Sequence, residues 1–178
     1  MKRLITMLFM LMLIPLSCSA ISLDEIQSKP EQYKNIIETS TGTVYVDINS
    51  IKSLRYAPPY YTLQTKSYFV IYNLSCISEQ TINFSYDYSR SLNSLIKKVD
   101  RENPTKSTDE KINLIYQEAS KDCGVIQSIV KADNYELDGK FITKGDTEYN
   151  LKVNYNKGVF NIANYIFRKA FDEDFLPA

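Results

Sequence analysis

Asp47 is the residue that most invites a chemical interpretation, because it stands inside an apolar alternation in "TVYVDINSIKS". A carboxylate held on a strand can act as a general acid or base, but it needs a partner group, and the 178 residues contain no His. We therefore predict that Asp47 lies opposite the face that carries Val44 and Val46, and so points to solvent. There it would cap the turn that ends the strand, by accepting hydrogen bonds from the backbone around Asn49 and Ser50.

The composition argues against several kinds of catalytic site. Without His, the chain lacks the base of Ser–His and Cys–His nucleophilic sites and the commonest zinc ligand. It has no C-x-x-C, so neither a thiol-redox site nor a thiolate zinc site has its spacing. None of the five Gly lies in a phosphate-binding motif. We expect a protein that is not an enzyme and that uses no cofactor and no metal.

Carboxylates are the remaining candidates for chemistry. Asp172, Glu173 and Asp174 are adjacent and could hold a hard cation, but calcium loops place ligands at alternate positions around a Gly turn, and this run has neither feature. We interpret the run as a solvated tail. Because a pair of carboxylates can also perform acid–base hydrolysis, a carboxylate-based hydrolase is kept as an alternative function.

Tyrosines gather around a Pro pair near the middle of the first half of the chain. The cluster consists of Tyr56, Pro58, Pro59, Tyr60 and Tyr61. Aromatic side chains beside a stiff turn offer contact area at a low cost in conformational entropy, so the cluster is a candidate interaction surface. The alternative is that Tyr is a good strand residue and that a low-GC genome inflates its frequency together with Asn, Lys and Ile.

The first twenty residues have the three parts of a secretory signal peptide. Lys2 and Arg3 provide the positive start, 4–13 is an apolar segment too short to span a membrane, and small residues precede a cleavage site after Ala20. We expect an exported protein, in the periplasm or at the cell surface. A lipid anchor on Cys18 is the alternative, although Pro15 stands where an anchor signal would have an aliphatic residue.

Cleavage would leave 158 residues (178 minus 20), enough for one domain, 21–178, with a core of its own. Without Lys2 and Arg3, 19 basic residues face 21 acidic ones, and this net charge of −2 argues against a nucleic-acid partner. Two cysteines would also remain, Cys76 and Cys123. In an oxidising compartment such a pair most often forms one disulfide, and two free thiols are the alternative.

Alternation with a period of two predicts a series of strands that would carry these residues. The predicted strands cover 43–48, 60–72, 80–88, 125–131, 133–137 and 149–155. Short turns join the first three, which indicates an antiparallel meander, and "DGK" at 138–140 is a hairpin signal. No segment after the signal peptide is long and apolar enough to span a membrane.

Helical spacing of apolar residues recurs between and after these strands. It covers 92–99, 112–119 and 162–167, and a short helix is expected after Ser22. Ser107 and Glu110 form a capping-box pattern, and Ser89 or Ser91 would cap the helix that follows them. An antiparallel sheet of five to six strands with two to three packed helices, one of them C-terminal, is an α+β fold.

Two stretches give the chain a family resemblance. "TVYVDINSIKS" and "KDCGVIQSIVKADNYELDGKFI" resemble the opening strand and the Asp-Cys strand of the bacterial surface-adhesin E family of small exported proteins. The resemblance implies an antiparallel sheet flanked by helix, export to the periplasm or outer surface, and, for some members, adhesion to host matrix or plasma proteins.

The chain departs from that family in two ways. Family members tend to pair the Asp-Cys cysteine with one near the C-terminus, whereas "FRKAFDEDFLPA" has none, so Cys76 would have to serve. The link 75–121 is also longer than is usual for the family. We predict an exported, non-enzymatic binding or adhesion domain whose partner is a host or envelope protein. A structural or envelope-maintenance protein without a host ligand is the alternative.

Overall fold

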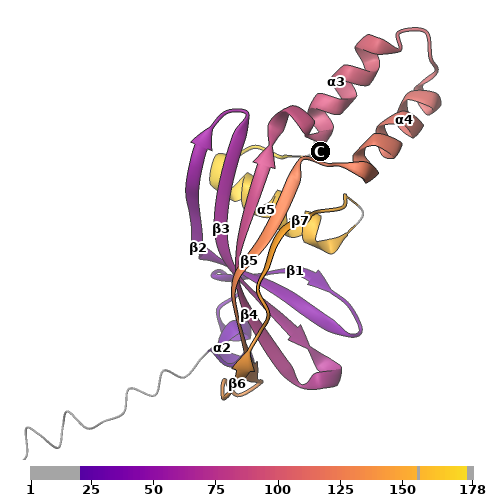
Figure 1. The fold of residues 1–178 in the computed structure, drawn as a ribbon. Coiled ribbons are helices and arrows are strands. Elements are labelled where there is room, and N and C mark those ends of the chain that lie inside the picture. Colours follow the sequence, from indigo (N-terminus) through magenta and orange to yellow (C-terminus); the bar gives the residue numbers. More distant parts are fainter. Residues whose placement is uncertain (1–20, 156, 176–178) are drawn as a thin grey trace, which may run out of the picture.

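One antiparallel sheet of seven strands forms the body of the molecule (Figure 1). It is seen in a computed structural model that describes residues 21–155 and 157–175, so the predicted signal peptide, with Cys18, lies outside the described residues. The strands lie in the order β1-β2-β3-β4-β5-β6, and β7 also pairs with β5. Their bounds are β1 Tyr33–Glu38, β2 Gly42–Ala57, β3 Tyr60–Ile71, β4 Cys76–Asp87, β5 Val125–Glu136, β6 Phe141–Lys144 and β7 Glu148–Lys152.

Sequence pattern and strands agree best at the centre of the sheet. β2, β3 and β4 are neighbours both in the chain and in the sheet, as a meander requires. The segments 125–131 and 133–137, predicted as two strands, form the single strand β5, in which Val130 is an extra residue opposite β4. Two strands lie outside the predicted ranges: β1, whose sequence "YKNIIE" lacks a period of two, and the short β6, which follows the "DGK" turn.

Four α-helices and two short 3₁₀ helices complete the described chain. Their bounds are α2 Leu23–Ser28, η1 Tyr72–Leu74, η2 Tyr88–Arg90, α3 Leu92–Glu102, α4 Thr108–Lys121 and α5 Gly158–Phe171. The Ser22 hydroxyl caps α2, Ser91 caps α3, and Ser107 with Glu110 forms the reciprocal capping box that opens α4. The antiparallel sheet and the C-terminal helix confirm the predicted α+β class.

The larger core lies between one face of the sheet and α5 (Figure 1). Its fully buried side chains from the strands are Val46, Leu63, Ile82 and Phe84, and those from α5 are Phe160, Ile162, Ile166 and Phe167. Tyr86 is 2% exposed among them, and its hydroxyl donates to the Ala163 carbonyl oxygen at 2.8 Å. This bond satisfies the one polar atom of a large aromatic ring and joins β4 to α5.

The opposite face of the sheet differs between its two ends. Because side chains alternate along a strand, Tyr45 and Tyr68 point away from α5, and they pack with Ile26 of α2 in a second, smaller core. At the other end this face is polar and half-exposed, and it carries Thr62, Gln64, Asn83 and Ser85. Gln64 Nε2 donates to Asn83 Oδ1 across the β3–β4 pair at 3.0 Å.

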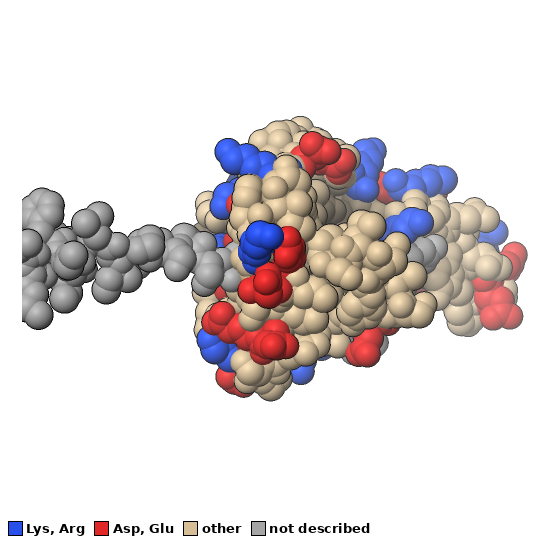
Figure 2. All heavy atoms as spheres, turned by 90° about the horizontal axis from the view of Figure 1, so that it is seen from below, with Lys and Arg blue, Asp and Glu red and all other residues tan. Residues whose placement is uncertain are grey.

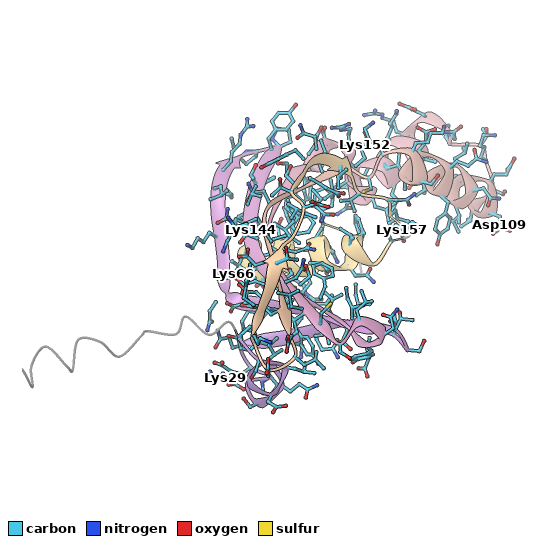
Figure 3. All side chains as sticks on the ribbon, turned by 60° about the horizontal axis from the view of Figure 1, so that its bottom comes forward. Lys29, Lys66, Asp109, Lys144, Lys152 and Lys157 are labelled. Atoms are coloured by element: carbon cyan, nitrogen blue, oxygen red, sulfur yellow. The ribbon has the colours of Figure 1, made fainter. Side chains whose placement is uncertain are left out.

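The helices α3 and α4 lie side by side and extend away from the sheet (Figure 1), and we call residues 91–122 the arm. Asp109, at the start of α4, marks its far end in Figure 3. The arm leaves and rejoins the sheet at one point, since the Asp87 amide donates to the Gly124 carbonyl oxygen at 2.8 Å. Gly124 has a φ of +75°, and a Cβ there would come within 2.6 Å of the Asp87 carbonyl oxygen, so only glycine fits this close approach.

Candidate binding surfaces

Asp47 caps an irregularity inside a strand and does not end one. Its Oδ1 accepts hydrogen bonds from the Asn49 amide at 3.1 Å and from Gln32 Nε2 at 3.3 Å, while Ser50 Oγ donates to its carbonyl oxygen at 2.6 Å. β2 nevertheless continues to Ala57 past a bulge that lies between Asp47 and Lys52. Asp47 is only 9% exposed, because the smaller core around Ile26 and Tyr45 covers this part of the sheet. The prediction that its side chain points to solvent is therefore wrong.

The predicted disulfide between Cys76 and Cys123 is wrong, and both thiols are free. Cys76 lies opposite Glu136 at one end of the β4–β5 pair. At the other end Tyr86 faces Val125, and Cys123 lies two residues before Val125. About ten strand residues separate them, or about 33 Å at 3.3 Å per residue, whereas a disulfide needs Cα atoms within about 7 Å. Cys123 is buried and its Sγ donates to the Val153 carbonyl oxygen at 2.9 Å.

The acidic run after α5 is divided among structural roles. Asp172 ends the helix in the left-handed region at a φ of 56°, and Asp174 lies 3.8 Å from an Arg168 nitrogen. Glu173 is exposed, whereas Phe175, the residue that follows the acidic run, is fully buried against α5. Among the described residues no group of three metal-ligating side chains comes together.

The Tyr–Pro cluster forms the tip of the β2–β3 hairpin, which contains a cis peptide bond between Pro58 and Pro59. The structure separates its three tyrosines. Tyr61 points toward α5, with ring centroids 5.4 Å from Phe167 and 5.2 Å from Phe171, and burial raises the pKa of its hydroxyl. Tyr61 therefore has a structural role and fastens the tip to the C-terminal helix.

Tyr56 and Tyr60 are the exposed members of the cluster, 67% and 47% accessible, and they lie on opposite faces of the hairpin. Tyr56 pairs across the strands with Tyr61 in an edge-to-face contact at 5.4 Å, and its ring also lies 5.5 Å from that of Phe171 on α5. Tyr60 is on the polar face, where the Arg55 guanidinium carbon lies 5.4 Å from the centre of its ring. Both strands of this tip thus present an aromatic side chain whose orientation is set by a neighbour.

Arg90 joins the arm to the sheet. Its Nε donates to Asp87 Oδ2 at 2.7 Å and its Nη1 donates to Asp122 Oδ2 at 2.5 Å, so one guanidinium connects the end of β4 to the end of α4. Burial acts to raise the pKa of Asp87, but hydrogen bonds from Ser89 and Arg90 outweigh it and hold that pKa below its ordinary value. The hydrogen bond to Asp87 in turn raises the pKa of Arg90.

A cavity of about 380 Å³ lies beside Arg90 at the base of the arm, and we call it the arm hollow. Its charged lining residues are Arg90, Lys98, Arg101, Glu118, Lys121 and Asp122. Lys121 Nζ lies 2.7 Å from Glu118 Oε1, and this hydrogen bond lowers the pKa of Glu118. Sequence reasoning does not find this site, because its side chains come from η2, α3 and α4. Helical spacing relates Lys98 to Arg101 and Glu118 to Lys121, but no local pattern brings the two pairs together.

Elsewhere the described surface is mixed in charge. Figure 2, which views the molecule from below, shows acidic and basic side chains interspersed on that face, in line with the balanced composition. Exposed apolar side chains occur on β6 and β7, where Phe141, Ile142 and Tyr149 are 53%, 49% and 60% accessible. Within the described chain, no helix has the length and hydrophobicity needed to cross a bilayer.

Comparison with known proteins leaves the family resemblance untested. No protein-family model matches the chain, and neither a curated protein nor a solved structure is detectably similar to it. The likeness of two short stretches to the surface-adhesin E family therefore stays a prediction.

Proposed function

We propose that the protein is an exported, non-enzymatic binding domain that contacts a host or envelope protein through the tip of the β2–β3 hairpin. The observation that carries the proposal is the difference in burial among the three tyrosines of the tip. Tyr61 is packed against Phe167 and Phe171, whereas Tyr56 and Tyr60 are 67% and 47% exposed beside the Pro pair. Exposed aromatic side chains that are held in place by their neighbours are typical of a protein contact surface.

Two physical features make this tip suited to binding. Tyr loses little conformational entropy on contact because it has few rotatable bonds, and the Arg55 and Tyr61 contacts already restrict Tyr60 and Tyr56. The polar end of the sheet continues from the tip, with a shallow depression of about 140 Å³ lined by Thr62 and Ser85 among others. An aromatic centre with polar groups beside it matches the usual composition of an interface.

Export rests on the sequence alone, namely the signal-peptide pattern of residues 1–20 and the resemblance to the surface-adhesin E family. Protease treatment of intact cells separates the two compartments. Digestion of the protein would place it at the cell surface, and full protection in cells with an intact envelope would place it in the periplasm.

The contact surface is tested with the double variant Tyr56→Ser/Tyr60→Ser of the chain without its signal peptide, with Tyr61 kept because it is structural. Binding to immobilised matrix and plasma proteins is measured by biolayer interferometry. We expect the variant to lose more than about tenfold in affinity, as hot-spot aromatics do. Tyr149→Ser is the matched control, since Tyr149 is 60% exposed on β7, away from the tip.

Two results would count against the proposal. Equal affinity of the double variant and the parent for a bound partner would remove the tip as the contact surface. Failure of the parent to bind any matrix or plasma protein, together with periplasmic location, would favour the envelope-maintenance role. A carboxylate hydrolase finds little support in the arm hollow, where Glu118 is paired with Lys121 and Asp122 with Arg90.

A further inference from the structure

The arm hollow has the size and wall of a small-molecule site. Its volume of about 380 Å³ falls within the range of ligand pockets, at the small end. Three elements form it: η2 contributes Arg90, α3 contributes Lys98 and Arg101, and α4 contributes Glu118 and Lys121. Leu95 supplies an apolar part of the wall.

The charge in the arm hollow is unbalanced toward the positive. Four cationic side chains and two carboxylates line it, a net charge of +2, which becomes +1 when Asp87, the other carboxylate bonded to Arg90, is counted. Glu118 is paired with Lys121, and Asp122 is paired with Arg90. Lys98 and Arg101 are therefore the cations that have no carboxylate partner among the lining residues. Among the described residues Lys98 has no ion pair, and Arg101 reaches only Glu102, at 3.7 Å and on the open surface.

One of the cations is already oriented. Two of the three guanidinium nitrogens of Arg90 are fixed by Asp87 and Asp122, so the group is held in place while Nη2 has no hydrogen-bond partner in the described chain. Ser89 and Ser94, which also line the hollow, use their hydroxyl hydrogens on Asp87 Oδ1 and the Tyr88 carbonyl oxygen. The hollow thus offers mainly N–H donors of cationic groups to a ligand.

We propose that the arm hollow binds a small ligand through an oxyanion, a phosphate or sulfate group, with Lys98 and Arg101 as the principal contacts and Arg90 as a fixed donor. An anion matches the positive surplus of the hollow, and hydrogen bonds between cationic donors and such oxygens are among the strongest in proteins. This function is additional to the protein contact proposed for the hairpin tip, and it involves none of the tip residues.

The test compares neighbouring lysines on α3. Lys98→Gln and Arg101→Gln each remove a charge from the hollow, whereas Lys97→Gln removes the same charge from an exposed position outside it. Titration calorimetry of the chain without its signal peptide uses inorganic phosphate, sulfate and glycerol 3-phosphate at low and constant ionic strength. Sedimentation with vesicles that contain phosphatidate shows whether the group can also be presented by a lipid.

We expect the parent to bind at least one oxyanion, Lys98→Gln and Arg101→Gln each to weaken that binding about tenfold, and Lys97→Gln to change it less than about twofold. Vesicle binding that is lost in both Lys98→Gln and Arg101→Gln but kept in Lys97→Gln would identify a headgroup as the source of the oxyanion. The proposal is overturned if the parent binds none of the probes, or if Lys97→Gln weakens binding as much as Lys98→Gln. Either result would leave the hairpin-tip proposal intact, because the tip variants are scored on protein partners.

Discussion

The helix α5 and the arm bury their apolar residues to very different degrees, although all of these helices are amphipathic. α5 lies on the sheet and has five buried residues, from Phe160 to Phe167, whereas α3 and α4 have one each, Val99 and Ala119. Ile112 and Tyr116 of α4 are 42% and 54% exposed. A helix gains most of its stability from the surface it packs on, so we infer that α5 belongs to the stable body and the arm to a less stable part.

The largest expected effect is that of Phe167→Ala. Phe167 is 1% exposed, and its ring contacts Tyr61, Tyr86 and Phe175, so its loss leaves a cavity between sheet and helix. We expect a loss of about 3–5 kcal/mol in the free energy of unfolding, measured by urea denaturation. Ile112→Ala in the arm, where the side chain is 42% exposed, should cost less than about 1 kcal/mol. Equal losses from the two variants would contradict the comparison.

Arg90→Gln should loosen the arm and leave the body intact. The change leaves Asp87 and Asp122 without their shared cation. Because the Arg90 side chain is 49% exposed, we expect a loss of only about 1 kcal/mol after allowance for solvent screening. Hydrogen exchange should speed up in α3 and α4 but not in β3 and β4. Faster exchange throughout the sheet would show that the arm and the body unfold together.

The same ion pair predicts a pH dependence. The pKa of Asp87 in the folded protein lies below its ordinary value of 3.8, so its stabilisation is present above the unfolded pKa and is lost as the pH falls through the folded pKa. In the parent, the free energy of unfolding should therefore decrease as the pH is lowered below about 4, and part of this decrease should be absent in Arg90→Gln. Parallel pH profiles for the two proteins would exclude Asp87 as the source.

A smaller effect, an increase in the free energy of unfolding, is expected from a change inside the body. Ser67 is fully buried in β3, and in the described structure its Oγ has no hydrogen-bond partner. Replacement by Ala removes an unpaired polar atom with little change in shape, so Ser67→Ala should raise the free energy of unfolding by up to about 1 kcal/mol. Thermal and urea denaturation measure the change. A clear destabilisation would mean that the hydroxyl is bonded in solution.

The two cysteine thiols should differ in their accessibility to a labelling reagent, and this test needs no change in the stability of the protein. Cys76 is half-exposed at the start of β4, whereas Cys123 is buried next to the arm and burial raises the pKa of its thiol. We expect iodoacetamide to modify Cys76 in the native protein without reductant, and Cys123 only after unfolding. Absence of labelling until reductant is added would contradict the free thiols described for the two cysteines.

Local pattern predicted the elements of the fold well, because each depends on neighbours in the sequence. The capping box at Ser107 and Glu110 appears in the structure as the start of α4, and the alternation predicted for 60–72 appears as β3, which ends at Ile71. The pattern could not tell which helices pack on the sheet. The stripes of 112–119 and 162–167 both have apolar residues at helical spacing. Only the fold decides that 112–119, on α4, faces α3 and that 162–167, on α5, faces β-strands.

Long-range arrangement explains the differences at the candidate sites. The Cys76–Cys123 pairing was inferred from composition, but the length of β4 and β5 places the two residues at opposite ends. Asp47 was expected at a strand end, but the register of β2 with β3 resumes at Lys52. The arm hollow draws its charges from three elements, which no local pattern brings together.

The bond between Asp87 and Gly124 has a consequence for how the chain is built. Because these two residues are already neighbours across the β4–β5 pair, the chain between them leaves the sheet and returns to it at the same place. In architectural terms the arm is an insert in a β-hairpin, and a short turn that joins Arg90 to Cys123 could stand in its place without altering the sheet order. The body and the arm can then be exchanged, lengthened or lost independently of each other.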